Sequence, residues 1–264
     1  MNRRSRSSHL PLFSLVACII ALLGAEGVWG QADGGPVSPV WQYRSGLWVM
    51  HPLPDSDKSF EQFEKILSGN PYLTGVFMHG GWSEIEAKEG EYNWESMDRA
   101  IEVLRKTGKK YALDIGGSRP PNFVYAAGAE KFVYRDDNPH HGARYLTEMS
   151  MPLPWDPIWQ KYYENILRKA GERYSSDPNC LSIVLTCSRT AEMHFPRRPE
   201  EAQRWRAYEN WDKRVIDSYT TLMDVLAEAF PRQQIVLMVS QMFNENDATG
   251  HSDEQIVVPI IEYG

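Results

Sequence analysis

The chain is poor in cysteine, with 3 among its 264 residues. Small exported domains without a large core are usually held together by several disulfides, so this count excludes a disulfide scaffold. Cys180 and Cys187 are the two that lie beyond the first thirty residues, and they flank an apolar run. If that run is one extended strand, their separation is roughly 23 Å at about 3.3 Å per residue, too far for a disulfide bond.

Several enzyme motifs are also missing. The sequence has no H-E-x-x-H, no G-x-S-x-G, no Walker loop and no G-x-G-x-x-G, so zincin, α/β-hydrolase and nucleotide-binding chemistry find no support. The adjacent pair His140 and His141 would point to opposite sides of an extended segment, and it predicts a surface pair rather than a metal site. We therefore expect no metal and no cofactor.

Basic residues are outnumbered by acidic ones. The whole chain carries a net charge of −7, from 28 basic and 35 acidic residues. Removing residues 1–30, with three arginines and one glutamate, leaves 25 and 34, a net charge of −9. This acidic balance argues against nucleic acid or an anionic membrane surface as a partner.

The N-terminus has the pattern of a secretory signal peptide. Three arginines precede an apolar run at residues 10–23, and small residues follow up to Gly30. The run is too short for a comfortable membrane span, so we expect cleavage near Gly30, no stable membrane span afterwards, and a secreted or periplasmic protein. Lipid attachment at Cys18 is the less favoured alternative, because the apolar run continues past it. Residues 31–45, rich in Gly and Pro, predict a linker.

From residue 46 onwards, apolar runs alternate with helical patterns. Strands are predicted at residues 47–50, 76–79, 110–115, 181–185 and 234–240, and helices begin at Asp55 or Ser56, at Asn93, at Asp156, at Pro199 and at Asp253. Strands and helices of these lengths predict the crossovers of an α/β fold with a parallel sheet. Residues 116–154 form an unusually long connection, and loops of that length inside a compact domain are usually functional or mobile.

One stretch carries a family resemblance. Trp82, Ile85-Glu86, Glu89-Gly90 and Tyr92-Asn93-Trp94, followed by a helix and an apolar strand, resemble the second βα unit of retaining (β/α)8-barrel glycoside hydrolases, beta-galactosidase-like members in particular. The resemblance implies that residues 46–264 form a TIM-barrel type domain. Only about five of the eight βα units are predicted, so we expect a partial barrel from a truncated gene product. A smaller doubly wound α/β domain is the alternative.

The resemblance also implies a two-carboxylate mechanism. In this clan the acid/base glutamate follows the fourth strand, and Glu192 stands in that place. The family usually has Asn before this glutamate, whereas this chain has Ala191. The nucleophile is expected at the seventh strand and is missing from this chain. A solvated loop carboxylate remains the alternative interpretation of Glu192.

Several side chains near the predicted strand ends suit a sugar, because aromatic faces stack on pyranose rings and polar groups hold hydroxyls. The predicted substrate-binding residues are His79, Trp82, Asp114, Arg119, Asn122, Trp155 and His194. Asp114 lies within an apolar strand, so it is either paired or faces a cavity. Trp94, Trp205 and Trp211 are assigned to packing.

The sequence therefore predicts a glycoside hydrolase acting on a carbohydrate substrate. Two alternatives use the same scaffold. One is a non-catalytic carbohydrate-binding protein that has lost the site, and the other is a different hydrolase or isomerase whose chemistry comes from the long connection.

Overall fold

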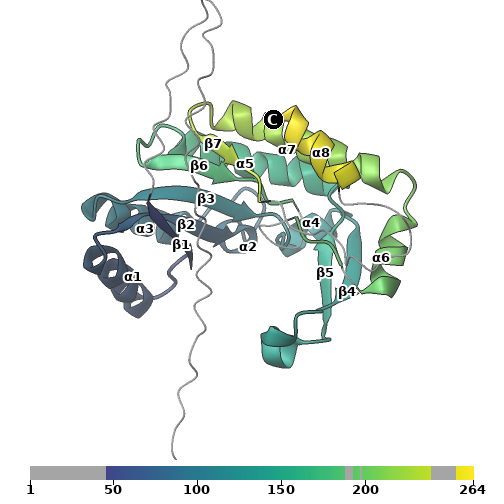
Figure 1. The fold of residues 1–264 in the computed structure, drawn as a ribbon, viewed down its shortest axis with the longest axis horizontal. Helices are drawn as coiled ribbons and strands as arrows, with labels where there is room; N and C mark the ends of the chain where they lie inside the picture. Colours follow the sequence, from purple (N-terminus) through teal and green to yellow (C-terminus); the bar gives the residue numbers. More distant parts are fainter. Residues whose placement is uncertain (1–45, 188–192, 197, 239–253) are drawn as a thin grey trace, which may run out of the picture.

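Five parallel strands form the main sheet, in the order β1-β2-β3-β6-β7 (Figure 1). The computed structural model describes residues 46–187, 193–196, 198–238 and 254–264. The strands are β1 (Leu47–Pro52), β2 (Leu73–Gly81), β3 (Lys110–Gly116), β6 (Cys180–Val184) and β7 (Gln234–Val236). Each strand pairs in parallel with the next one in this order. The predicted α/β class with a parallel sheet is confirmed.

Helices connect these strands and cover the sheet. They are α1 (Asp57–Gly69), α2 (Trp82–Ile85), α3 (Glu95–Lys106), α4 (Asn122–Ala126), α5 (Pro157–Tyr174), α6 (Pro199–Arg206), α7 (Trp211–Ala229) and α8 (Glu254–Tyr263). In Figure 1, α5, α7 and α8 lie together on one side, whereas α1 and α3 lie beside β1 to β3. The predicted break in the segment from residue 199 to 230 is the gap between α6 and α7.

Two predicted helix starts are confirmed by their caps. Ser56 caps α1, and its side chain and that of Ser59 form a reciprocal capping box. Asp156 caps α5 by accepting from the backbone N–H groups of Ile158 and Trp159, at 2.9 and 2.8 Å. The start of α3 lies one residue later than predicted, because Trp94 occupies the cap position and Asn93 accepts from Glu95 N–H instead.

The long connection from residue 116 to 154 contains structure that the sequence analysis missed. Strands β4 (Lys131–Arg135) and β5 (Glu148–Pro152) pair as an antiparallel hairpin, with a 3-10 turn at Pro139–Arg144 between them. The hairpin stands away from the main sheet, next to α6 (Figure 1). Phe132 and Tyr134 alternate with exposed residues along β4, a pattern of period 2 too short to stand out among the prolines and glycines around it.

The core is rich in aromatic side chains. Trp82, Trp159, Trp205, Tyr111 and Tyr163 are completely buried. Trp205 and Trp211 are packing residues, as predicted, and Trp94 packs edge-on against Tyr174 with 5.6 Å between ring centroids. Among the described residues, no helix combines the length and the apolar character that crossing a membrane requires.

Both described cysteines are buried and have free thiols. Cys180 opens β6, whereas Cys187 lies beyond the end of that strand, so the premise that both sit on one strand is wrong. Burial raises the pKa of the Cys180 thiol to about 12. Cys180 is therefore a packing residue rather than a reactive one.

Candidate active site

Three polar side chains meet at the carboxyl ends of β2, β3 and β6. The register of the sheet places His79 opposite Asp114. Nδ1 of His79 lies 2.6 Å from one carboxylate oxygen of Asp114, and the hydroxyl of Thr186 donates to the other oxygen at 2.7 Å. Residues at this end of the strands form the active site in (β/α)8 enzymes. We call His79, Asp114 and Thr186 the strand-end cluster.

The strand-end cluster rests on α5. The hydroxyl of Tyr163 lies 2.5 Å from the carbonyl of Ile115 and 2.8 Å from that of Thr186, so it ties the ends of β3 and β6 together. The indole N–H of Trp159 donates to the carbonyl of Gly117 at 3.1 Å. Burial raises the pKa of Tyr163 well above its usual range, so its proton stays available for these bonds.

Two glycines at the end of β3 allow this close packing. A Cβ on Gly116 would lie 2.9 Å from Cε1 of His79, and a Cβ on Gly117 would lie 2.7 Å from Cζ of Tyr163. Both distances are shorter than carbon atoms tolerate, so a side chain at either position would displace its neighbour. In the glycine pair predicted as a strand end, Gly116 therefore makes room for the imidazole and Gly117 for the ring of Tyr163.

The imidazole of His79 is held in a charged setting. Its hydrogen bond to Asp114 raises the pKa of His79, burial opposes this, and the nearby Arg119 and Glu84 lower and raise it respectively. The side chain of His79 is 47% exposed, whereas that of Asp114 is 5% exposed. Asp114 thus fixes the ring through Nδ1, as carboxylates fix functional histidines in many sites, and leaves Nε2 for another partner.

The other predicted site residues fall in different places. Glu192 lies outside the described residues. Trp82 is completely buried, its indole N–H donates to Glu86 at 2.9 Å, and its ring packs on Tyr163. A ring enclosed in this way has no face for a sugar, so placing Trp82 at a sugar-binding surface was wrong.

Trp155 packs edge-on against Trp205 and Tyr208, with centroid distances of 5.0 and 5.5 Å, and so belongs to the contact between the hairpin and the α6 region. Asn122 begins α4 and is exposed. His194 is half-buried beside Met193, whose N–H donates to the carbonyl of Met238 at 3.0 Å. No described contact joins Trp155 or Asn122 to the strand-end cluster.

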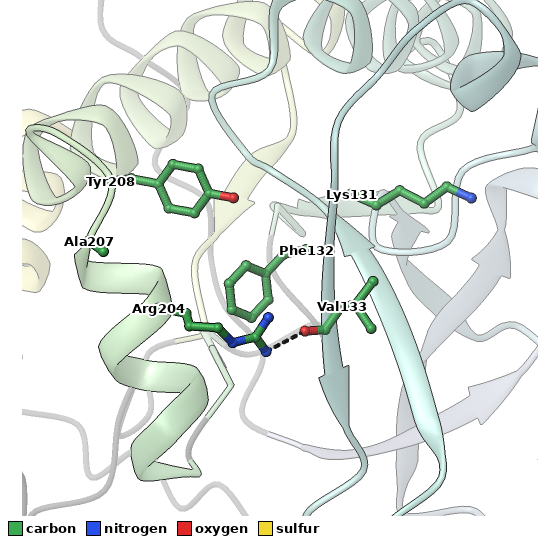
Figure 2. A pocket seen from close by; sticks show the side chains of 6 residues that line it. All are labelled: Lys131, Phe132, Val133, Arg204, Ala207 and Tyr208. Carbon is green, nitrogen blue, oxygen red and sulfur yellow. Dashed lines mark hydrogen bonds between the residues drawn. The ribbon is translucent and has the colours of Figure 1, made fainter.

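A separate hollow of about 360 Å³ lies between β4 and α6 (Figure 2). Lys131, Phe132 and Val133 line it from the strand, and Arg204, Ala207 and Tyr208 line it from the helix side. Arg204 donates to the carbonyl of Val133 at 2.7 Å and lies over the ring of Phe132. Arg204 is thus engaged by the strand backbone, and the hollow shares no lining residue with the strand-end cluster.

Histidine and carboxylate do come together at the hairpin, where Nδ1 of His141 lies 2.7 Å from Asp136 and Arg144 lies 3.6 Å from the same carboxylate. This pairing was missed from the sequence. His140 and His141 are both exposed, as the surface-pair interpretation predicted. Within the described ranges, no group of three His, Cys, Asp or Glu side chains could hold a metal ion.

Comparison with known proteins decides the family. Residues 74–207, about half of the chain, match the glycoside hydrolase family 42 sequence family described as Beta-galactosidase. The chain belongs to glycoside hydrolase family 42. The matched region runs from β2 through α6 and includes the whole strand-end cluster, as well as the stretch that carries the resemblance seen in the sequence.

Two curated relatives of this family 42 chain are beta-galactosidases. The chain is 24% identical over 213 residues to beta-galactosidase BbgII of Bifidobacterium bifidum, an alignment that covers 78% of the chain and 29% of the relative. It is 25% identical over 210 residues to beta-galactosidase BglY of Alicyclobacillus acidocaldarius, covering 78% of the chain and 26% of the relative. The chain therefore spans less than a third of the length of these relatives.

The fold is shared with a solved structure as well. A beta-galactosidase from the psychrophilic Marinomonas ef1 superposes with a TM-score of 0.52 at 13% identity, over 76% of this chain and 38% of the other. At that identity the likeness speaks for the fold alone. It supports the predicted architecture, in which the five parallel strands of the family 42 chain correspond to part of a (β/α)8 barrel.

The sequence analysis missed Thr186, which belongs to the strand-end cluster, and Glu84, which lies near it. Thr186 directly follows the apolar run of β6 in Leu-Thr-Cys, and a hydroxyl just past a buried strand is the signal that could have singled it out. Glu84 lies on α2 and gave no such signal, because a single carboxylate in a polar stretch is ordinary. Its proximity to His79 emerges only from the fold.

Proposed function

We propose that this chain is the part of a family 42 glycoside hydrolase that binds a β-galactoside and supplies the acid/base carboxylate, Glu192. The family match over residues 74–207 is the observation that carries the proposal. Glu192 follows β6, the fourth parallel strand in chain order, which is where the retaining barrel clan places this residue. Its carboxylic acid would protonate the leaving glycosidic oxygen and then, as carboxylate, activate water.

The strand-end cluster gives further support. His79 of this cluster, together with its neighbours Arg119 and Glu84, supplies the directional donors and acceptors that a sugar ring needs. On this proposal His79 and Arg119 contact the glycone or the hydroxyls beside it, and Trp82 acts only as packing beneath them. A retaining mechanism also requires a second carboxylate. The barrel clan places it at the seventh strand, and the described residues form five parallel strands.

The proposal is tested with Glu192→Gln in the full-length gene product. Hydrolysis of an alkyl β-galactoside, whose leaving group needs protonation, is expected to fall by about a hundredfold or more. Hydrolysis of a nitrophenyl β-galactoside is expected to fall less, because nitrophenolate leaves without a proton. Initial rates on both substrates give the two ratios.

Glu61→Gln is the matched control, because Glu61 is an exposed carboxylate on α1. It is expected to leave both rates unchanged. Equal rates for Glu192→Gln and the unaltered protein would remove Glu192 from the mechanism. If the unaltered protein binds galactosides and hydrolyses none, the carbohydrate-binding alternative replaces the enzymatic one.

A further inference from the structure

We propose that His79 holds the substrate through Nε2, which bonds a hydroxyl of a neutral galactoside, and that Asp114 is the positioning residue that aims this nitrogen. The inference rests on the proposed function for the identity of the sugar. It assigns different tasks to two residues that sequence analysis placed together as sugar-binding residues.

Asp114 has no free oxygen to offer a sugar. Its Oδ2 faces Nδ1 of His79 at 2.6 Å, its Oδ1 accepts from the hydroxyl of Thr186 at 2.7 Å, and its side chain is 5% exposed. A buried carboxylate engaged on both oxygens acts on the substrate only through the group that it orients. That group is the imidazole of His79, which is 47% exposed.

The orientation of the imidazole leaves one nitrogen for a ligand. Nδ1 is occupied by Asp114, and the ring lies against Gly116, with Cε1 2.9 Å from where a Cβ would be. Nε2 has no hydrogen-bond partner among the described residues. When the ring is charged, Nε2 donates, and a charge-assisted hydrogen bond to a hydroxyl is the stronger kind. When the ring is neutral with its proton on Nδ1, Nε2 accepts from a hydroxyl instead.

The charges around His79 indicate a neutral ligand. Asp114 on β3 and Glu84 on α2 contribute negative charge, whereas Arg119 after β3 and the imidazolium itself contribute positive charge. Thr186 on β6 is uncharged. When the ring is charged, these two acids and two bases among the described residues nearly cancel, so this set offers both donors and acceptors with little net attraction for an anion. Such a set suits the hydroxyls of an unsubstituted sugar better than a uronate or a sulfated sugar.

Two substitutions of His79 separate sugar contact from structural support, because each amide replaces one ring nitrogen. Asparagine reaches the place of Nδ1 and can still bond Asp114, whereas glutamine reaches the place of Nε2. The probe is isopropyl β-thiogalactoside, which resists hydrolysis, with its Kd measured by calorimetry on the full-length gene product. His79→Asn is expected to weaken binding by about tenfold or more, and His79→Gln by only about threefold.

A third substitution tests the positioning role. Asp114→Asn keeps the shape of the side chain and removes its charge, so His79 should lose its proton at a lower pH than in the unaltered protein. The Kd of the thiogalactoside is then expected to begin rising at a lower pH in Asp114→Asn than in the unaltered protein. A purely structural role for Asp114 would lower stability and leave the pH profile of Kd in place.

His140→Asn and His140→Gln are the controls, because His140 is exposed on the hairpin turn. Equal affinities for the Asn and Gln substitutions at position 79, or better binding with Asn, would overturn the inference while galactoside binding itself remains. If the unaltered protein fails to bind the thiogalactoside, the proposed function fails and this inference fails with it.

Discussion

At the scale of single residues, Glu201 on α6 stands out as a buried carboxylate. One of its oxygens accepts from the backbone N–H of Arg135 at 2.6 Å, and the other has no hydrogen-bond partner among the described residues. Burial raises the pKa of Glu201 above its ordinary value of 4.5. The folded state therefore binds this proton more tightly than the unfolded state does.

A pH dependence of stability follows. Because the folded pKa is the higher one, stability is lost as pH rises from 4.5 through the raised pKa, and charged Glu201 weakens the fold above that range. Glu201→Gln keeps the acceptor for Arg135 and removes the charge. We expect it to be more stable than the unaltered protein at pH 8, by a margin that vanishes below pH 4.5. Denaturant unfolding at a series of pH values measures this difference.

The neighbouring Glu200 provides the control. It is exposed, and its own backbone N–H together with Arg198 lowers the pKa of its carboxyl group. The shift has the opposite sign, so Glu200→Gln is expected to lose stability at pH 8 rather than gain it. An equal gain in stability at pH 8 in both variants would show that removing any negative charge from α6 stabilises the protein, whether or not the carboxylate is buried.

Some of this residue-level detail was predictable from the sequence. The caps of α1 and α5 were, because a cap depends on residues two or three positions away. The pairing of His79 with Asp114 was not, because they lie 35 residues apart and meet only through the register of two strands. The role of Glu192 came from family resemblance alone and remains a prediction.

At the scale of elements, α5 packs closely against the end of β3 because residue 117 there is a glycine. Gly117 lies so close to Trp159 and Tyr163 that a Cβ would come within 2.9 and 2.7 Å of their rings. Both rings are completely buried and stack on one another with 4.9 Å between centroids. Neither ring can move away without disturbing the core, since interiors are packed as densely as crystals.

Gly117→Ala is therefore expected to lower the free energy of unfolding by about 1–3 kcal/mol. Gly69→Ala is the matched control, because Gly69 is the last residue of α1 and nothing lies within 4 Å of a Cβ there. Alanine favours helix over glycine, so this control is expected to be neutral or to stabilise slightly. Thermal or denaturant unfolding compares the two; equal losses would mean that Gly117 is not constrained by packing.

The sequence predicted the parallel strands and missed the hairpin for a physical reason. Strands such as β3 are almost completely buried, so they are continuous apolar runs that are easily recognised. Strands β4 and β5 have 5 residues each; β4 buries only alternate side chains, and β5 buries only its last two. Their signal in the sequence is therefore weak. The hairpin is stabilised by a tertiary contact instead: Trp205 packs edge-on against Phe132, with 5.0 Å between ring centroids.

At the scale of the whole molecule, the two ends of the sheet serve different purposes. The carboxyl ends hold the strand-end cluster. At the amino ends, buried Asp177 accepts from Arg105 at 2.8 Å, from the hydroxyl of Tyr111 at 2.9 Å and from Asn179 N–H at 2.9 Å. In (β/α)8 folds the first end carries function and the second carries stability.

Asp177→Ala is expected to lower the free energy of unfolding by roughly 3 kcal/mol, because it leaves the buried Tyr111 hydroxyl and the Asn179 N–H without their acceptor and takes from Arg105 its nearer carboxylate. The KM for a galactoside is expected to stay unchanged. Asp114→Asn is expected to change KM clearly and to change the free energy of unfolding less than Asp177→Ala does. Unfolding curves and initial rates on the same preparations give both numbers; a raised KM in Asp177→Ala would show that the two ends are coupled.

The parallel sheet could be predicted from the sequence, and its strands neighbour one another in chain order, as the strands of a (β/α)8 barrel do. The composition of the site could be predicted only in part, because polar residues at strand ends are visible in the sequence and their mutual distances are not. The predicted signal peptide and linker lie outside the described residues, and export remains a prediction.

The contact between α6 and β4 protects part of an exposed strand edge against aggregation. Arg204 occupies the carbonyl of Val133, and Glu201 occupies the N–H of Arg135, two backbone groups that face the same edge of the strand. An unpaired strand edge is a template on which another chain can add, and such addition seeds aggregates. Here two side chains bind this edge where a neighbouring strand would pair, so another polypeptide that adds to it finds two of its bonding positions already taken.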